Sequence, residues 1–209
     1  MQHNKFLEGK LSAVLSLTIA ACLVMLLGIT TEPNTAKGAA AVTVSATINE
    51  SVTCSNTQSS ITFGTLTAGA ISTASPSATS SLSCNSSGGC TLNVQGAGDT
   101  VSPGLYKAAG TTTAQLIASA DATLAAGTEG YGIQAATSSA GTGAVLTLNS
   151  KYRVLNNQVG GLTVTNTALA SSSGPVASKE VGVTHKAAIS ALTRAGSYTD
   201  TISYSCTGN

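Results

Sequence analysis

Apolar and polar residues alternate in short runs from Val42 to the C-terminus, and clusters of Gly, Ser and Asn separate these runs. A period of two is typical of a strand with one buried and one exposed face, and no long window after Ile29 shows the period of an amphipathic helix. The pattern therefore predicts a chain of strands and turns. We expect strands at residues 42–48, 60–66, 79–84, 90–96, 114–120, 130–136, 144–150, 181–190 and 197–206.

The turn-rich segments between these runs predict an all-β fold of short antiparallel strands. Strands at this spacing are typical of two packed sheets. We therefore expect residues 42–209 to form a single domain, an antiparallel Greek-key, immunoglobulin-like β-sandwich. A barrel is the alternative architecture, and residues 120–127 could form a short helical turn between the sheets.

A continuous apolar run from Leu11 to Ile29 follows two lysines and precedes a polar stretch that ends in small residues. These are the parts of an export signal, but the run is longer than the usual core of ~7–15 residues and close to the ~20 that span a bilayer. We expect residues 1–41 to be either a signal peptide cleaved after Ala41 or an N-terminal hydrophobic helix that anchors the chain, with a short linker. In both cases we expect the domain to be exported to the periplasm, the cell surface or the extracellular space, and only an uncleaved chain would meet the membrane, through residues 11–29.

Charged residues make up 8 % of the chain, and the six basic and six acidic residues beyond Val42 cancel. Nucleic-acid binding needs clustered Lys or Arg to displace counterions from phosphates, and these bases are scattered without an aromatic platform beside them. Nucleic acid is therefore excluded as a partner. Trp is absent, and Ala, Ser, Thr, Gly and Val dominate, so each core residue buries little area and covalent cross-links would add stability.

Four cysteines lie beyond the apolar run, an even number that predicts two disulfides in an exported domain. They are Cys54, Cys84, Cys90 and Cys206. Cys84 and Cys90 flank a short glycine-rich loop and could close it, which would leave Cys54 to pair with Cys206. The competing arrangement pairs Cys54 with Cys84 and Cys90 with Cys206, and the spacing leaves both open.

The sequence shows no constellation of catalytic residues. His185, the one histidine outside the leader, lies at an alternating strand position, and a triad through Asp121 or Asp200 would lack a marked nucleophile because no G-x-S-x-G elbow is present. Asp99, Asp121 and Glu129 lie in turns, where carboxylates commonly bond the local backbone. We expect no catalytic, cofactor-binding or metal-binding residues, no cofactor, no small-molecule substrate and no enzymatic activity.

Zinc and carbohydrates are the two ligand classes for which the sequence offers candidate side chains. Zinc is disfavoured because the cysteines lack C-x2-C spacing and a single histidine is available. The best side chains for stacking on a carbohydrate are the five tyrosines, since each offers a rigid face and a polar tip, but one core or edge tyrosine per strand is the favoured explanation. They are Tyr106, Tyr131, Tyr152, Tyr198 and Tyr204.

Three segments carry a resemblance to known families. They are ATINESVTCSNTQSSITFGTL at residues 46–66, TSSLSCNSSGGCTLNVQGAG at residues 79–98 and AGSYTDTISYSC at residues 195–206. In this order they resemble the opening and closing strands of chaperone-usher pilins and of the spore coat protein U family. The chain is also similar to exported immunoglobulin-like surface proteins of candidate-phylum bacteria.

The resemblance implies an immunoglobulin-like sandwich, complete or lacking a strand, with a disulfide from Cys54 to Cys84 and a structural role in a surface fibre or coat. Cys90 and Cys206 depart from the pattern. Donor-strand exchange, in which a neighbour's extended arm fills a missing strand, would need a free alternating arm. Residues 42–48 could serve, but the expected internal strands leave no gap to fill.

We therefore expect a non-enzymatic, exported structural protein of the cell surface, such as a pilus- or coat-like subunit, whose partners are copies of itself or other surface proteins. The alternative is an adhesin or carbohydrate-binding module displayed on a membrane.

Overall fold

The structure is a computed structural model that describes residues 41–109 and 115–209. The chain divides into two units, Met1–Thr47 and Ile48–Asn209. The apolar run at residues 11–29 lies outside the described residues, as does the rest of the expected leader up to residue 40. No helix within the described ranges is long and apolar enough to cross a membrane.

Residues 42–48 do not form the expected strand. This segment has no regular structure and every residue in it is exposed. Alternation alone does not make a strand, because a strand is stabilised by the backbone hydrogen bonds and side-chain contacts that a neighbouring strand supplies. The apolar side chains Val42, Val44 and Ile48 are 84 %, 88 % and 86 % exposed.

The first sheet is built around one long central strand, β13 (Val176–Ala188). On one side β13 pairs with β3 (Ala78–Cys84) and β2 (Ile71–Thr73), and on the other with β8 (Gly130–Thr137) and β9 (Thr142–Gly143). β1 (Val52–Asn56) pairs with the outer side of β3 and forms an edge of the sheet.

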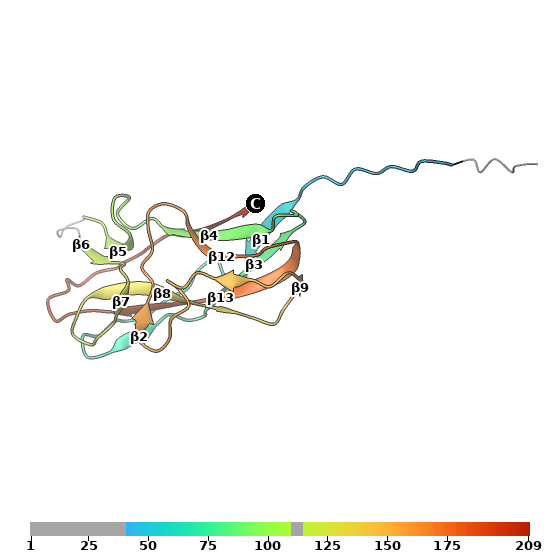
Figure 1. Cartoon of the computed structure of the whole chain (residues 1–209). Coiled ribbons are helices and arrows are strands. Elements are labelled where there is room, and N and C mark those ends of the chain that lie inside the picture. Colours follow the sequence, from blue (N-terminus) through green and yellow to red (C-terminus); the bar gives the residue numbers. More distant parts are fainter. Residues whose placement is uncertain (1–40, 110–114) are drawn as a thin grey trace, which may run out of the picture. The chain divides into compact units, whose positions relative to one another are not determined.

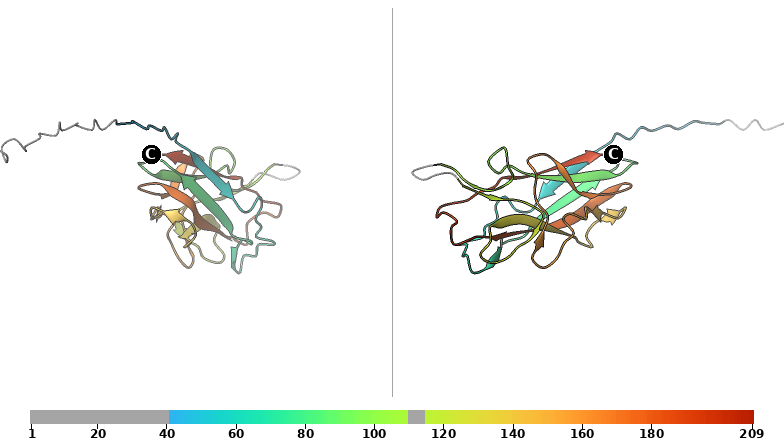
Figure 2. Two further views of the ribbon diagram at one scale, coloured as in Figure 1. Left: turned by 90° about the vertical axis from the view of Figure 1, so that its right-hand side faces the viewer. Right: turned by 60° about the vertical axis from the view of Figure 1, so that its left-hand side comes forward.

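The second sheet has the strand order β10 (Thr147–Leu148), β12 (Thr167–Ser171), β4 (Cys90–Gly96), β14 (Ile202–Gly208). β14 pairs with β4 along its whole length and forms an edge of this sheet. Two small ladders complete the fold, β5 (Gly104–Lys107) with β6 (Gln115–Ala118) and β7 (Ala122–Thr123) with β11 (Gln158–Val159). Every ladder is antiparallel, and in Figures 1 and 2 β4 and β13 lie in different layers.

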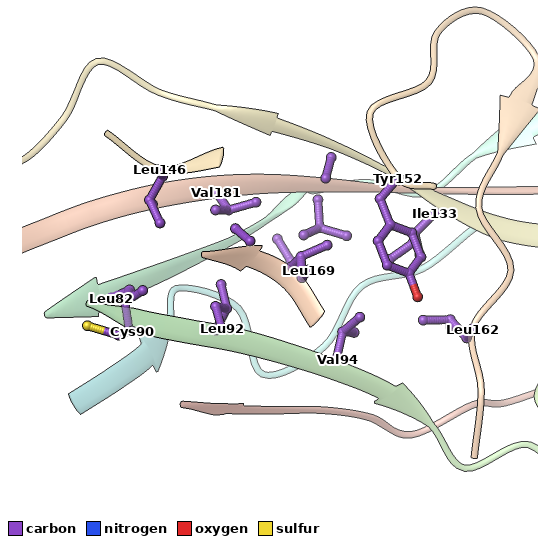
Figure 3. Packing of buried hydrophobic residues seen from close by; sticks show 14 of the residues in the cluster. Leu82, Cys90, Leu92, Val94, Ile133, Leu146, Tyr152, Leu162, Leu169 and Val181 are labelled. Carbon is purple, nitrogen blue, oxygen red and sulfur yellow. The ribbon is translucent and has the colours of Figure 1, made fainter. Parts of the chain in front are cut away.

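The core lies between these two sheets. Alternate residues of β3 and β4 are buried, as a strand with one face on a core requires. Figure 3 shows Leu82 of β3 and Leu92 and Val94 of β4 facing side chains from β12 and β13. The fold is therefore all-β and sandwich-like, with a core of mostly aliphatic side chains.

The connection from β3 to β4 passes from the first sheet to the second through the loop NSSGG. Gly89 has φ +87° and packs so closely against the Ser172 carbonyl that a Cβ atom has no room. Its amide donates to the Ser86 carbonyl at 3.0 Å and closes the turn. A glycine is needed here both for the backbone conformation and for the close approach.

The expected strands at residues 79–84, 90–96 and 130–136 are confirmed as β3, β4 and β8. Those at 114–120, 144–150, 181–190 and 197–206 correspond to β6, β10, β13 and β14 with shifted bounds. The strand expected at residues 60–66 is wrong, because this segment contributes a single bridge from Thr62 to Ser75. The helical turn considered for residues 120–127 is also wrong: β7 and a turn occupy this stretch.

Candidate functional site: a groove between two edge strands

Two disulfides tie the sheets together. Cys54 of β1 pairs with Cys206 of β14, with Cα atoms 6.1 Å apart, and Cys84 at the end of β3 pairs with Cys90 at the start of β4, with Cα atoms 6.5 Å apart. The structure thus has the first of the two arrangements that the spacing left open, and not the Cys54–Cys84 bond that the resemblance implies. Two such cysteine pairs are compatible with an oxidising, exported location.

A groove of about 860 Å³ opens where β1 ends. Its first wall comes from the segment 56–66, and its second wall comes from the segment 193–204, which includes Ile202 and Tyr204 of β14. The floor consists of inward-facing residues of the strands beneath: Ala78, Leu105, Ile117, Tyr131, His185 and Ile189. All of these floor residues except Ile189 are buried, and the partly exposed apolar side chains of the groove include Phe63, Leu66, Ile189 and Ile202.

Neither wall has a full strand ladder on the groove side. β1 pairs only with β3, and β14 only with β4, in the described part of the chain. The first wall continues beyond β1 with the single Thr62–Ser75 bridge, and the second wall is held before β14 by a bridge from Thr199 to Tyr106. The alternating sequences at 60–66 and 197–201 thus line the groove without forming strands.

The floor of the groove contains a buried pair of polar rings. The Tyr131 hydroxyl lies 2.9 Å from His185 Nδ1, the rings stack at 20°, and each residue is 2 % exposed. Burial lowers the pKa of His185 to about 4, and burial together with the charge of Asp200 and the proximity of Tyr204 raises the pKa of Tyr131. The tyrosine therefore keeps its proton, the imidazole is neutral, and one hydrogen bond joins the two uncharged groups.

Asp200 and Tyr204 bring two further polar groups to the second wall. Asp200 Oδ1 accepts a hydrogen bond from the Gly98 amide at 2.8 Å, whereas Oδ2 and the Tyr204 hydroxyl are buried without a hydrogen-bond partner. Burial raises the pKa of Asp200, opposed by backbone hydrogen bonds, and burial also raises the pKa of Tyr204. The second wall is thus mostly polar in sequence, and two of its polar atoms are buried without a hydrogen-bond partner.

Gln115 at the start of β6 anchors the second wall. Its Oε1 accepts from the Arg194 amide at 2.9 Å and lies 3.0 Å from the Tyr198 hydroxyl, which is also 2.8 Å from the Arg194 carbonyl oxygen. Its Nε2 donates to Glu129 Oε1 at 3.0 Å, and the Thr193 hydroxyl donates to the same carboxylate oxygen. We call these five residues the rim clamp.

The other acids considered in the sequence lie apart from His185 and serve local structure. Asp99 Oδ1 accepts from the Val101 and Ser102 amides at 3.0 and 2.6 Å, and these bonds lower the pKa of Asp99. Asp121 accepts from the Gly161 amide at 2.7 Å and lies 3.6 Å from Lys151 Nζ. Within the described ranges no serine, cysteine or carboxylate is hydrogen-bonded to the His185 ring.

The tyrosines do not form a common surface. Tyr131 and Tyr152 are buried, Tyr204 is partly buried in the second wall, and Tyr106 and Tyr198 are partly exposed. Stacking on a sugar needs an exposed ring face, so Tyr131 and Tyr152 do not serve that role in this structure. Among the residues that the structure describes, no three His, Cys, Asp or Glu side chains gather as a metal site.

Neither the groove nor the rim clamp was expected from the sequence. Gln115 lies 79 positions from Arg194 and 83 from Tyr198, and no local pattern marks such a pairing. The signal that was available is the pair of alternating segments that lack a partner. Comparison with family models, with curated proteins and with solved structures finds no match to this chain.

Proposed function

We propose that this protein is a non-enzymatic, exported subunit of a surface structure, a pilus- or coat-like protein with an immunoglobulin-like sandwich, and that its copies are joined by strand addition. The observation that carries the proposal is the groove between the segments 56–66 and 193–204, where apolar side chains are partly exposed and neither wall has a strand paired to it on the groove side. In strand addition, an extended segment of another chain pairs with the free backbone of an edge strand. Its alternate side chains fill the pockets beneath.

The groove offers both parts of such an interaction. Edge strands present unpaired N–H and C=O groups, which are a template for another strand. The partly exposed apolar side chains Phe63, Leu66 and Ile189 line the groove and offer contacts to an incoming strand. Each aliphatic side chain fully buried there would contribute about 1.5–3 kcal/mol.

Residues 42–48, which we call the arm, match this groove in chemistry. The arm carries Val42, Val44, Ala46 and Ile48 at alternate positions, with Ser or Thr between them and no charge. Its large apolar side chains are exposed in the structure, so burying them in another copy would recover free energy that the isolated chain lacks. The proposed occupant of the groove is therefore the arm of a second copy.

The test introduces charge into the arm of the full chain. Val44→Asp with Ile48→Asp would place two carboxylates against the apolar floor, and burial of unpaired charge costs several kcal/mol. We expect the wild-type chain to form assemblies that grow with concentration and this variant to remain monomeric, as measured by light scattering with electron microscopy. Thr43→Asp with Thr47→Asp is the matched control, because it adds the same charge on the other face of the arm and should preserve assembly.

Assembly of the Val44→Asp, Ile48→Asp variant at wild-type concentrations would contradict strand addition by the arm. A wild-type chain that stays monomeric at all concentrations, and binds a saturable ligand, would favour the displayed binding module instead.

A further inference from the structure

We infer that the rim clamp holds the second wall away from the floor before a strand enters, so that Gln115 is a positioning residue for strand addition. The inference rests on the proposed function, because it describes how the same groove is kept ready for its occupant. Gln115 contributes no side chain to the groove lining itself. It acts through Arg194 and Tyr198, which do line the groove.

The clamp joins the wall to two different strands. Gln115 is the first residue of β6, and Glu129 directly precedes β8. Arg194, through its amide, and Tyr198, through its hydroxyl, bond to Gln115, and Thr193 bonds to Glu129. The bond from Gln115 to Glu129 couples the two anchors, so residues 193–198 of the wall are held by one connected network, and the Thr199–Tyr106 bridge holds the chain after them.

The wall needs such an anchor because few of its side chains are packed. Residues 194–197 are exposed and Leu192 is 89 % exposed, so the segment gains little from burial in its observed position. The partly exposed apolar side chains of the groove, Phe63, Leu66 and Ile189, would attract it, since closing over them removes apolar surface from water. Hydrogen bonds to Gln115 oppose that collapse.

A groove that is open only part of the time binds more weakly by the fraction of time that it is open. If loss of the clamp leaves the groove open about a tenth of the time, the apparent Kd rises about tenfold. The weaker binding comes from slower association, because an occupied groove makes the same contacts with the bound strand with and without the clamp. A residue with a merely structural role would lower the melting temperature without this selective change in association.

The experiment uses the full chain carrying Val44→Asp and Ile48→Asp, in which the groove is vacant under the proposed function. A fluorescent synthetic peptide with the sequence of residues 41–50 is titrated by anisotropy and its association rate is measured by stopped flow. Adding Gln115→Leu, which keeps the side-chain size and removes the bonds, should raise Kd about tenfold through slower association. Glu129→Gln, which keeps an acceptor oxygen for Gln115 and Thr193, should leave Kd within about twofold of the parent chain.

Gln134→Leu is the matched control. The Gln134 amide on β8 donates to the Asn156 and Gln158 carbonyls at 2.9 and 2.6 Å and does not line the groove. This variant removes comparable hydrogen bonds elsewhere, so it should lower the melting temperature without changing the association rate. Equal association rates in the Gln115→Leu and Gln134→Leu proteins would overturn the clamp.

A second measurement reports the solvent exposure of the chain at the second wall and needs no peptide. The chain contains no tryptophan, so Leu192→Trp would fluoresce only from the position that directly precedes the second wall. We expect Gln115→Leu to reduce the quenching of this tryptophan by iodide, as the wall folds inward, and Gln134→Leu to leave it unchanged. Unchanged quenching in both would overturn the clamp, whereas absence of peptide binding by the parent chain would overturn the proposed function and leave this reading of the wall intact.

Discussion

His185 is the side chain whose protonation most directly opposes folding. Its pKa is about 4 in the folded protein, because burial disfavours the charged ring, against about 6.5 for a free imidazole. The folded state therefore binds fewer protons than the unfolded state between these values. The stability linked to the neutral His185 ring is fully present above about pH 6.5 and is lost as the pH falls towards 4.

This shift predicts a pH dependence that depends on one residue. From about pH 7 to about pH 4 the free energy of unfolding should fall by on the order of 3 kcal/mol through His185. His185→Gln keeps an acceptor for Tyr131 and does not titrate, so the variant should lack this part of the slope. Urea unfolding at about pH 7, 5.5 and 4 measures both proteins, and identical slopes would show that the imidazole is already charged, or solvated, in the folded state.

The two disulfides differ in the length of chain that they close. Cys54–Cys206 spans 152 positions and joins the edges of the two sheets, whereas Cys84–Cys90 spans 6 positions within one connection. The chain-entropy relation gives a stabilisation of about 5 kcal/mol for the long loop and about 2 kcal/mol for the short one. The disulfide next to the groove is therefore expected to dominate the stability.

Removing each pair separately tests this difference. We expect Cys54→Ala with Cys206→Ala to lower the free energy of unfolding by about twice as much as Cys84→Ala with Cys90→Ala. Urea unfolding under non-reducing conditions measures both. A larger loss from the short-loop pair would mean that local strain or packing at the β3–β4 connection outweighs chain entropy.

The strands that could be predicted from the sequence are those with a buried face and two neighbours. β3 and β4 alternate strictly and are buried on every second residue, and the expected bounds agree with the structure to within one residue. β12 (Thr167–Ser171) was missed because TALAS is short and made of small residues, and its ladder with β4 shifts register after Ala168. Register and small-residue packing depend on the partner strand, which a local pattern does not contain.

The failures at residues 42–48 and 60–66 have a common cause. Both segments alternate as strands do, and neither has a partner along its length in the single chain. The groove could not be predicted because it depends on which strands lie at the edges of the two sheets. The rim clamp could not be predicted because side-chain amides such as that of Gln115 carry no periodic signal.

At the scale of the whole molecule, the arm and the groove both present apolar side chains to solvent. The arm has exposed apolar side chains, and the groove has partly exposed apolar side chains that no strand of the described chain covers. In a linear assembly the arm of each copy fills the groove of the next copy. Only one arm and one groove, at the two ends of the assembly, then remain unfilled. This reciprocity is what makes strand addition a route to a polymer.

The most direct test of strand addition locates the arm within an assembled sample. A photoreactive benzoyl-phenylalanine is placed at position 44 of the full chain, and copies labelled with nitrogen-15 are mixed with unlabelled copies before irradiation. Mass spectrometry then identifies which residues are joined and whether they come from different copies. We predict cross-links between copies to the segments 56–66 and 193–204; cross-links confined to one copy, or directed to surfaces outside the groove, would contradict assembly through the arm.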